Sequence, residues 1–357
     1  MVGIKRLADH LNLSIGTVSR ALNGRPDVNE VTRKRVLEAA NDLNYVANQS
    51  GRSLRRGMTG AIGFMVQTGP QFNVQGDNFF TSVFDGVQTV LNRHHLDLIV
   101  LLCSASEDPD QYLRRMVLRG FVDGMIISHT LRFDPRIAFL ASRRLPFVTL
   151  GRSETEAGQS WIDIDFEAIG RLAVQRFVSR GHRDIAVALP LDDINLGHVL
   201  HAAVSTTMAK HGLSLEPRNV LRSHPGELGG YEVAKMLHQL SPRPSAIVLS
   251  DDSLAVGLYR GLVEHGIAPG RDIAIIGRDS LPVRFLSPSL TRYGQSLRNL
   301  GIALGETLLA TMPAYQQYYP MGLVRRIWPL EFTEGESDAF DKSGRAQDIR
   351  DVAVPIN

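Results

Sequence analysis

The sequence predicts a small all-α helix-turn-helix head followed by a larger α/β body of two lobes with parallel sheets. Three observations favour this fold class. Apolar residues recur at helical spacing through residues 1–46. A polar, arginine-rich stretch follows at 47–60, and from residue 61 short apolar runs alternate with helical stretches. A chain of 357 residues is long enough for two or three domains.

The first predicted helix is amphipathic and ends near Asn12, where the chain turns at once into a second. Its apolar stripe consists of Ile4, Leu7, Ala8 and Leu11. The helix-turn-helix is the structural unit that this arrangement predicts.

The second predicted helix has signals at both ends. Ser14 can cap it through its hydroxyl, and Gly24 suits a left-handed residue that ends it. Its buried stripe is expected to comprise Val18, Ala21 and Leu22. The residues left on the outward face are Ile15, Gly16, Thr17 and Arg20. Because this face is short and close to the N-terminal end of the helix, it is suited to enter a DNA major groove.

A third helix closes the core of the head. Asn29 can cap it, and Val36, Ala40 and Leu43 make its apolar stripe. The head is also basic: residues 1–60 carry ten Lys or Arg against five Asp or Glu, although the whole chain has a formal charge of only +2. A basic head on a slightly acidic body is expected when only the head meets phosphates.

Residues 47–60 are expected to form a hinge. The segment is too short and too polar to hold a helix alone. Two interpretations stay open: a flexible linker, or a hinge that becomes helical on DNA.

The body, 61–333, is expected to be doubly wound. The predicted strands occupy 61–66, 97–102, 123–127, 146–150, 184–189, 246–249 and 272–277. Helices are expected at 166–180, 199–211 and 253–265. We assign 61–162 and 293–324 to an N-lobe, 163–292 and 325–333 to a C-lobe, and 334–357 to a disordered tail. Ligands of such sheets bind beyond the carboxyl ends of the strands, which predicts a ligand site between the lobes.

Several chemistries find no support in the sequence. The single cysteine, Cys103, lies in an apolar run and is expected to be a buried, inert thiol. No histidine spacing fits a metal site, no catalytic triad or phosphate loop is recognisable, and no cofactor is expected. No apolar run approaches the ~18 residues of a membrane span, so a soluble cytoplasmic protein that is not an enzyme and has no membrane partner is predicted.

The motifs together resemble the lac repressor and galactose repressor (LacI/GalR) family of transcription regulators over residues 2–333. The motifs that carry the resemblance are Ile4-Lys5-Arg6-Leu7-Ala8, Thr17-Val18-Ser19-Arg20-Ala21-Leu22-Asn23, Thr32-Arg33-Lys34-Arg35-Val36, Leu43-Asn44-Tyr45, Arg52-Ser53-Leu54, Arg180-Gly181-His182-Arg183, Ser250-Asp251-Asp252-Ser253-Leu254-Ala255-Val256-Gly257 and Ile276-Gly277-Arg278-Asp279. The resemblance implies a body like a type I periplasmic binding protein, a homodimer, a palindromic DNA operator and a small-molecule effector such as a sugar. The run 161–165 with Gly277-Arg278-Asp279 is similar to the α-glucoside-responsive branch.

For DNA binding, the resemblance assigns base reading to Ile15, Gly16 and Arg20 and backbone anchoring to the polar residues around them. Arg20 can bind guanine O6 and N7 bidentately, or contact a phosphate instead. Leu54 resembles the apolar wedges that enter a minor-groove base step, or else packs against protein. The complete predicted DNA-binding set is Ser14, Ile15, Gly16, Thr17, Ser19, Arg20, Asn23, Arg52, Leu54 and Arg55. Two departures from the family, Ala47 and Gly51, lie in or beside the hinge.

For the effector, the resemblance points to Phe79, Phe80, Ser128, His129, Arg152, Asp165, Asp251 and Asp279. Carboxylates and aromatic faces suit a neutral polyol. Phe79 or Phe80 could instead be core, and Asp165 could cap the next helix, as is expected of Asp252.

The family's usual arginine near the opening of the 199–211 helix is replaced by Leu200. Arg152, Arg278, His198 or His201 could orient the ligand instead. The function predicted is therefore a ligand-responsive repressor of a sugar-utilisation operon. The alternatives are a regulator controlled by a protein or other co-regulator, and, from other classes, a transport-type sugar-binding protein or an enzyme.

Overall fold

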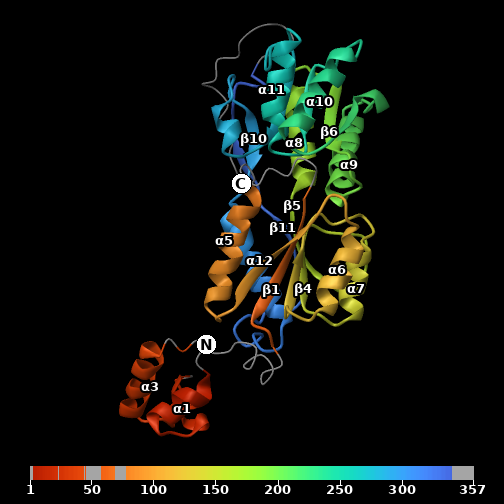
Figure 1. The fold of residues 1–357 in the computed structure, drawn as a ribbon. Helices are drawn as coiled ribbons and strands as arrows, with labels where there is room; N and C mark the ends of the chain where they lie inside the picture. The colour runs from red at the N-terminus through yellow and green to blue at the C-terminus, as the bar shows by residue number, and fades with distance from the viewer. Residues whose placement is uncertain (1–2, 23, 44, 46–57, 69–77, 340–357) are drawn as a thin grey trace. The chain divides into compact units, whose positions relative to one another are not determined.

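The computed structural model describes residues 3–22, 24–43, 45, 58–68 and 78–339. The chain divides into two compact units, residues 1–60 and 61–357 (Figure 1). The predicted residues Asn23, Arg52, Leu54 and Arg55 lie outside the described residues.

The described part of the first unit contains three helices, α1 (Ile4–Leu11), α2 (Ile15–Leu22) and α3 (Glu30–Asp42). Asn12 ends α1 in the left-handed conformation with φ 55°. The predicted apolar stripes meet in one core, in which Leu7, Val18 and Val36 are fully buried. The predicted helix-turn-helix is thereby confirmed.

The first lobe of the body is built on a sheet of six described strands in the order β11-β5-β4-β3-β1-β2, all parallel. Its strands are β1 (Ala61–Gln67), β2 (Asp97–Cys103), β3 (Gly124–Ile127), β4 (Phe147–Leu150), β5 (Ser160–Ile164) and β11 (Arg325–Trp328). Its helices are α5 (Asn78–Asn92), α6 (Pro109–Leu118), α7 (Pro135–Ser142) and α12 (Leu297–Thr311). Helices α5 and α12 cover one face and α6 and α7 the other (Figure 1).

Helices α5 and α12 approach each other closely through glycines. A Cβ atom on Gly86 would lie 2.1 Å from the Arg298 carbonyl oxygen, and one on Gly301 would lie 2.1 Å from the Val83 carbonyl oxygen. This contact fixes the start of α5, which carries Phe79.

The second lobe repeats the design with the strand order β12-β10-β9-β8-β6-β7. Its strands are β6 (Ile185–Pro190), β7 (Val220–Ser223), β8 (Ala246–Leu249), β9 (Ala274–Arg278), β10 (Thr291–Gly294) and β12 (Glu331–Thr333). Among these described strands only the β10–β12 pair is antiparallel. Its helices are α8 (Phe166–Ser179), α9 (Asn195–Lys210), α10 (Gly226–Gln239) and α11 (Leu254–Glu264), with 3-10 turns at Pro217–Asn219 and Pro282–Phe285.

The lobe boundaries differ from the prediction at the C-terminal end. Strand β11, which the prediction assigned to the C-lobe, pairs with β5 in the first sheet, with Arg325 opposite Trp161. Strand β12 pairs with β10 in the second sheet. The chain therefore crosses between the lobes once more, at Pro329 and Leu330, because each sheet takes one short edge strand from this segment.

The disordered tail predicted at 334–357 is wrong for its first six residues. Ser337 and Asp338 are fully buried, and the Ser337 carbonyl accepts a hydrogen bond from the Ile275 backbone N–H at 2.9 Å. Asp338 forms ion pairs with Arg176 and Arg180 of the second lobe. Polar composition misled the prediction because these polar groups are satisfied by specific partners inside the lobe.

The cysteine and the hydrophobicity of the helices were both subjects of the sequence analysis. Cys103 is buried, as predicted, and burial raises the pKa of its thiol. Among the described residues no helix has the length and hydrophobicity needed to cross a bilayer.

Candidate functional sites

The N-terminal end of α2 presents a short exposed face. The Ser14 hydroxyl oxygen accepts a hydrogen bond from the Thr17 backbone N–H at 3.0 Å, which confirms the predicted cap. Val18 and Ala21 are buried, so the helix is anchored on its other side. Ile15, 41% exposed although apolar, lies beside the exposed residues Gly16 and Arg20. An exposed apolar side chain and an exposed arginine near the start of a helix can contact base edges when the helix enters the DNA major groove.

Arg20 is paired in the structure with Asp27. Its Nε lies 3.3 Å from Asp27 Oδ2, and both side chains are more than half exposed. Exposed ion pairs contribute only ~0–1 kcal/mol. The guanidinium can therefore exchange Asp27 for a base or a phosphate at little cost.

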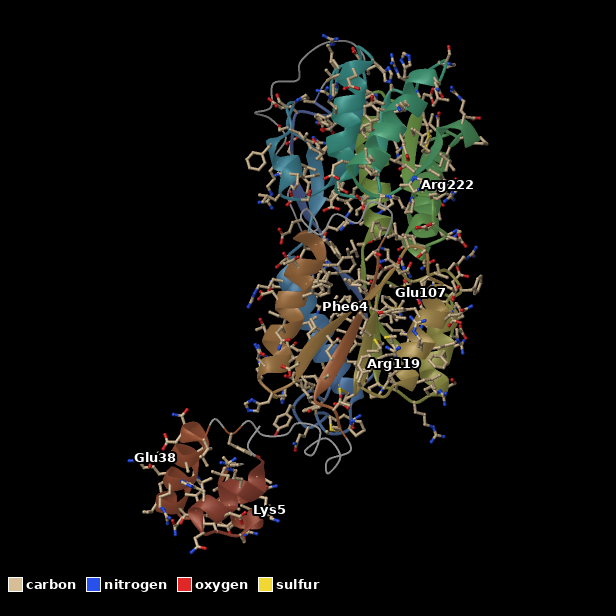
Figure 2. All side chains as sticks on the ribbon, viewed as in Figure 1. Lys5, Glu38, Phe64, Glu107, Arg119 and Arg222 are labelled. Atoms are coloured by element: carbon tan, nitrogen blue, oxygen red, sulfur yellow. The ribbon has the colours of Figure 1, made fainter. Side chains whose placement is uncertain are left out.

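The remaining predicted contacts of the head that the structure describes are polar, with Ser14 exposed and Thr17 and Ser19 half-buried. The Thr17 hydroxyl lies 2.9 Å from the Ser14 hydroxyl, and Ser19 is half-buried on the same helix. The neighbouring helices also carry exposed charged side chains, among them Lys5 on α1 and Glu38 on α3 (Figure 2).

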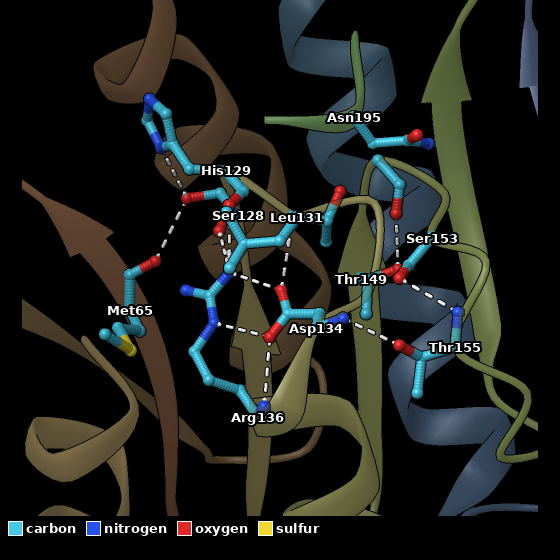
Figure 3. A network of polar contacts seen from close by, with 12 residues as sticks. Met65, Ser128, His129, Leu131, Asp134, Arg136, Thr149, Ser153, Thr155 and Asn195 are labelled. Atoms are coloured by element: carbon cyan, nitrogen blue, oxygen red, sulfur yellow. Dashed lines mark hydrogen bonds and ion pairs between the residues drawn. The ribbon is translucent and has the colours of Figure 1, made fainter. Parts of the chain in front are cut away.

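In the body, a buried ion pair holds the loop that follows β3. The Arg136 guanidinium donates to both carboxylate oxygens of Asp134, at 3.0 and 2.7 Å, and both side chains are at most 2% exposed. Arg136 Nη2 also donates to the carbonyls of Ser128 and His129, and Asp134 accepts from the Leu131 backbone N–H at 3.1 Å (Figure 3). The pair thus fixes the backbone that carries Ser128 and His129.

His129 is held as a neutral ring in a left-handed backbone conformation with φ 51°. Burial, with a smaller contribution from the Arg136 cation, lowers the pKa of His129 to about 4, against the opposing effect of Asp251 and Asp192. Its ring centroid lies 5.7 Å from that of Phe80. A neutral imidazole supplies one donor and one acceptor without charge. Ser128, by contrast, is buried and donates its hydroxyl to the Met65 carbonyl.

The same loop joins the two lobes. Leu131 forms an isolated antiparallel bridge with Ile194, and the Asn195 backbone N–H donates to the Thr130 carbonyl at 2.8 Å. The Asn195 side-chain amide donates to the Arg152 carbonyl, also at 2.8 Å. Asn195 is buried and opens α9 of the second lobe (Figure 3). We call this set of contacts, made by Thr130, Leu131, Arg152, Ile194 and Asn195, the lobe latch.

Three further predicted effector residues are engaged within the protein. The Arg152 guanidinium pairs with Asp163 at 3.0 Å and with Glu167 at 3.4 Å. Asp165 caps α8 by accepting from the Ala168 backbone N–H, the alternative that the sequence left open. Asp251 accepts from the Ser253 backbone N–H and hydroxyl next to the start of α11.

Asp279 lies beside two arginines after β9. Arg284 donates to both of its oxygens, at 3.1 and 2.7 Å, and Arg292 donates to one at 2.7 Å. Burial opposes ionisation, but the hydrogen bonds from the two arginines outweigh it and hold the pKa of Asp279 below its ordinary value. The carboxylate is therefore fixed in place and charged.

Aromatic residues meet at the start of α5. Phe80 is buried and packs with Phe64 and Phe84, which is the core role left open in the sequence. Phe79 is half-buried, and the Arg278 guanidinium of the second lobe lies over its ring at 5.7 Å. Phe79 and Arg278 thus bring the two lobes together at a second point.

Sequence reasoning missed the residues that join and support this region. Asn195, Asp163 and the Asp134–Arg136 pair were not singled out. Of these, only Asp134 carried a usable signal, since an Asp before a Pro is typical of a capped helix start. Leu200 is fully buried against Gly170 of α8. Within the described residues, no three His, Cys, Asp or Glu side chains converge to hold a metal ion.

A capped, exposed recognition helix on a basic head, together with a two-lobed α/β body, defines a DNA-binding regulator of transcription. Comparison with known proteins agrees. Residues 4–48 match the profile of bacterial regulatory proteins of the lacI family, and residues 174–337 match a periplasmic binding protein-like domain. The chain belongs to the LacI family of bacterial regulatory proteins.

Its relatives include named regulators. It is 31% identical over 314 residues to the HTH-type transcriptional regulator AglR of Rhizobium meliloti (strain 1021), covering 86% of this chain and 87% of the relative. It is 30% identical over 283 residues to the HTH-type transcriptional regulator RafR of Escherichia coli, covering 79% of this chain and 82% of the relative.

Solved structures share the fold. The lac repressor dimer bound to operator and the anti-inducer ONPF superposes with a TM-score of 0.81 at 20% identity, covering 94% of this chain and 99% of that one. The transcriptional regulator CelR in complex with cellobiose gives 0.69 at 23% identity, covering 94% and 100%. At these identities the likeness concerns the fold alone.

Proposed function

We propose that this regulator is a ligand-responsive repressor of a sugar-utilisation operon that binds a palindromic operator as a homodimer. The observation that carries the proposal is the exposed N-terminal end of α2, with Ile15 and Arg20 outward, in one chain with a body whose lobes meet at polar and aromatic residues. Support comes from relatives: the lac repressor structure holds an operator and an anti-inducer, and the CelR structure holds cellobiose.

We propose the ten DNA-binding and eight effector-binding residues of the sequence prediction as its sites. The geometry supports them unequally. Ile15 and Arg20 are exposed on the head, while Phe79, His129 and Asp279 lie at or near the facing ends of the two lobes. Several of these residues have structural partners that a ligand would have to share: Phe80, Arg152, Asp165, Asp251 and also Asp279. The α-glucoside class of sugar is part of this proposal.

The mechanism we infer is a population shift. A ligand that binds between the lobes favours one relative orientation of them, and in the dimer this moves the N-lobes and orders or melts the paired hinges around Leu54. Since operator DNA is cytoplasmic in bacteria, we infer that the protein acts there, as a regulator without enzymatic activity.

A thermal-shift screen with mono- and disaccharides and phosphorylated sugars tests this function. We expect at least one sugar to raise the unfolding temperature and to change operator affinity measured by fluorescence anisotropy. A screen in which no sugar does either would contradict the proposal and favour control by a protein co-regulator.

Leu54→Ala is expected to weaken operator binding about ten- to a hundredfold and to reduce DNA bending, because an apolar wedge offsets the cost of unstacking a base step with new contacts. Leu54 lies outside the described residues. Anisotropy gives the affinity and energy transfer between the operator ends gives the bend. Leu37→Ala, at a half-exposed leucine of α3, is the matched control and should change neither. Unchanged bending in the Leu54 variant would reject the wedge.

Asp279→Asn is expected to reduce the effector response by about tenfold or more while ligand-free operator affinity stays within about twofold. Hydrogen bonds to a charged group contribute ~1.5–3 kcal/mol, and the neutral amide loses that charge. The measurement is the effector concentration that half-changes operator affinity. Asp272→Asn, at an aspartate paired with the exposed Arg271, is the control. A fully responsive Asp279 variant would remove this residue from the site.

A further inference from the structure

Arg278 is a buried cation where the two lobes meet. It is the last residue of β9 and only 7% exposed. Its guanidinium lies over two aromatic rings, that of Phe79 on α5 of the first lobe at 5.7 Å and that of Phe166 at the start of α8 at 5.4 Å. The side chain is therefore directed into the region between the lobes.

The neighbouring arginines are neutralised by carboxylates and Arg278 is not. Arg152 pairs with Asp163, Arg136 with Asp134, and Arg292 with Asp279. Across the described residues, no carboxylate lies within ion-pair distance of Arg278, and its Nε is buried without a hydrogen-bond acceptor. The Nε of Arg152 also lacks a hydrogen-bond acceptor, but Arg152 has carboxylates at 3.0 and 3.4 Å, so the feature that sets Arg278 apart is the missing counterion. A buried polar group without a partner calls for an explanation, and binding of an oxygen-bearing molecule is one.

The two rings alone do not account for a cation at this position. The attraction of a guanidinium to aromatic faces is smaller than the cost of removing a cation from water. An apolar side chain of similar length would fill the space between Phe79 and Phe166 without that cost. An oxygen-bearing partner would supply the acceptor and the charge compensation that the two rings do not.

We propose that Arg278 is the residue that clamps the effector, donating from its planar fork to two adjacent oxygen atoms of the ligand. This assignment rests on the proposed effector-responsive function and gives its site the cation that Leu200 does not supply. The chemistry is a paired-oxygen acceptor on a small polyol, either two neighbouring hydroxyls or the carboxylate of a sugar acid. The Phe79 ring beside it suits the C–H face of a sugar.

The position of Arg278 also connects binding to lobe movement. It belongs to the second lobe and touches Phe79 of the first. A ligand held by Arg278 against Phe79 contacts both lobes at once, so its binding energy depends on their relative orientation. Arg278 is thus placed to determine both ligand choice and response.

Arg278→Met tests the assignment in the full-length protein. We expect the variant to unfold at a higher temperature than wild type without ligand, because a buried unpaired charge is removed. We expect its affinity for the sugar that stabilises wild type to fall at least about tenfold, the loss of a charge-assisted bidentate contact. Arg326→Met is the matched control, since Arg326 lies 4.7 Å over the Trp328 ring but is exposed. This variant should change neither the ligand-free unfolding temperature nor the affinity for the sugar.

The probes are cellobiose, maltose, ribose, glucose and glucuronate, measured by calorimetry. If glucuronate binds more tightly than glucose and Arg278→Met removes this difference, the acceptor on the ligand is a carboxylate. If only a neutral sugar loses affinity in Arg278→Met, the acceptor is a pair of hydroxyls. Unchanged affinity in Arg278→Met overturns the proposal, and so does a lower ligand-free unfolding temperature, which would show a structural role. A wild-type protein that binds no probe contradicts the sugar-responsive function, while the ligand-free temperature still decides the role of Arg278.

Discussion

Arg20→Ala is expected to weaken specific operator binding strongly at ordinary salt concentrations. A bidentate arginine–guanine contact contributes ~1–3 kcal/mol of discrimination, and a dimer on a palindrome makes two, so affinity should fall roughly thirtyfold to ten-thousandfold. The structure supports the role, since Arg20 is exposed on α2 and its partner Asp27 holds it through an exposed ion pair. Anisotropy titrations on the operator and on scrambled DNA measure the effect.

The control for Arg20 is Arg35→Ala, which removes an exposed cation from α3. It should weaken binding to both DNAs slightly and equally. Should Arg20→Ala lower the affinity for operator and scrambled DNA by the same factor, with a shallower salt dependence, Arg20 contacts a phosphate and does not read a base.

Asp134→Ala is expected to destabilise the body by ~3–5 kcal/mol, because it leaves the buried Arg136 cation without its counterion. Arg136 is 1% exposed and has both of its carboxylate contacts on Asp134. Urea unfolding followed by tryptophan fluorescence gives the change in stability. Replacing both partners, Asp134→Leu with Arg136→Met, should recover most of the loss.

Asp108→Ala is the matched control for Asp134. Asp108 also caps a helix that begins with proline, accepting from the Gln111 backbone N–H at 2.8 Å, but it is exposed and holds no arginine. Its loss should cost ~1 kcal/mol. If the two substitutions cost the same, the ion pair adds nothing beyond the cap.

The fold was predictable where local signals are strong. Buried central strands such as β1 and β8 appear in the sequence as short apolar runs. Ser14 and Asn29 cap α2 and α3, as their positions in the sequence predict. The edge strand β2 was predicted as well, because it is an apolar run. Strands β7 and β11 were not predicted, because they are half polar, and β11 pairs with β5 far away in the sequence. The buried segment around Ser337 and Asp338 was missed for the same reason.

The site was predictable only as a region. Carboxylates after parallel strands serve equally well as helix caps and as ligand groups, so the sequence could not separate Asp165, a cap, from Asp279, a charge held between arginines. Phe80 and Phe79 are adjacent, yet one packs in the core and the other lies under Arg278. Only the packed structure distinguishes such pairs.

The lobe latch has a consequence for the dose–response curve of this regulator. Its two hydrogen bonds from Asn195 contribute ~0.5–1.5 kcal/mol each, and every ~1.4 kcal/mol that a conformational change must overcome raises the half-maximal effector concentration about tenfold. If the responsive state separates the lobes there, Asn195, which belongs to neither proposed recognition surface, helps to set the effector concentration at which the gene responds. Sensitivity can then be retuned by substitution of Asn195 while both recognition surfaces stay unchanged.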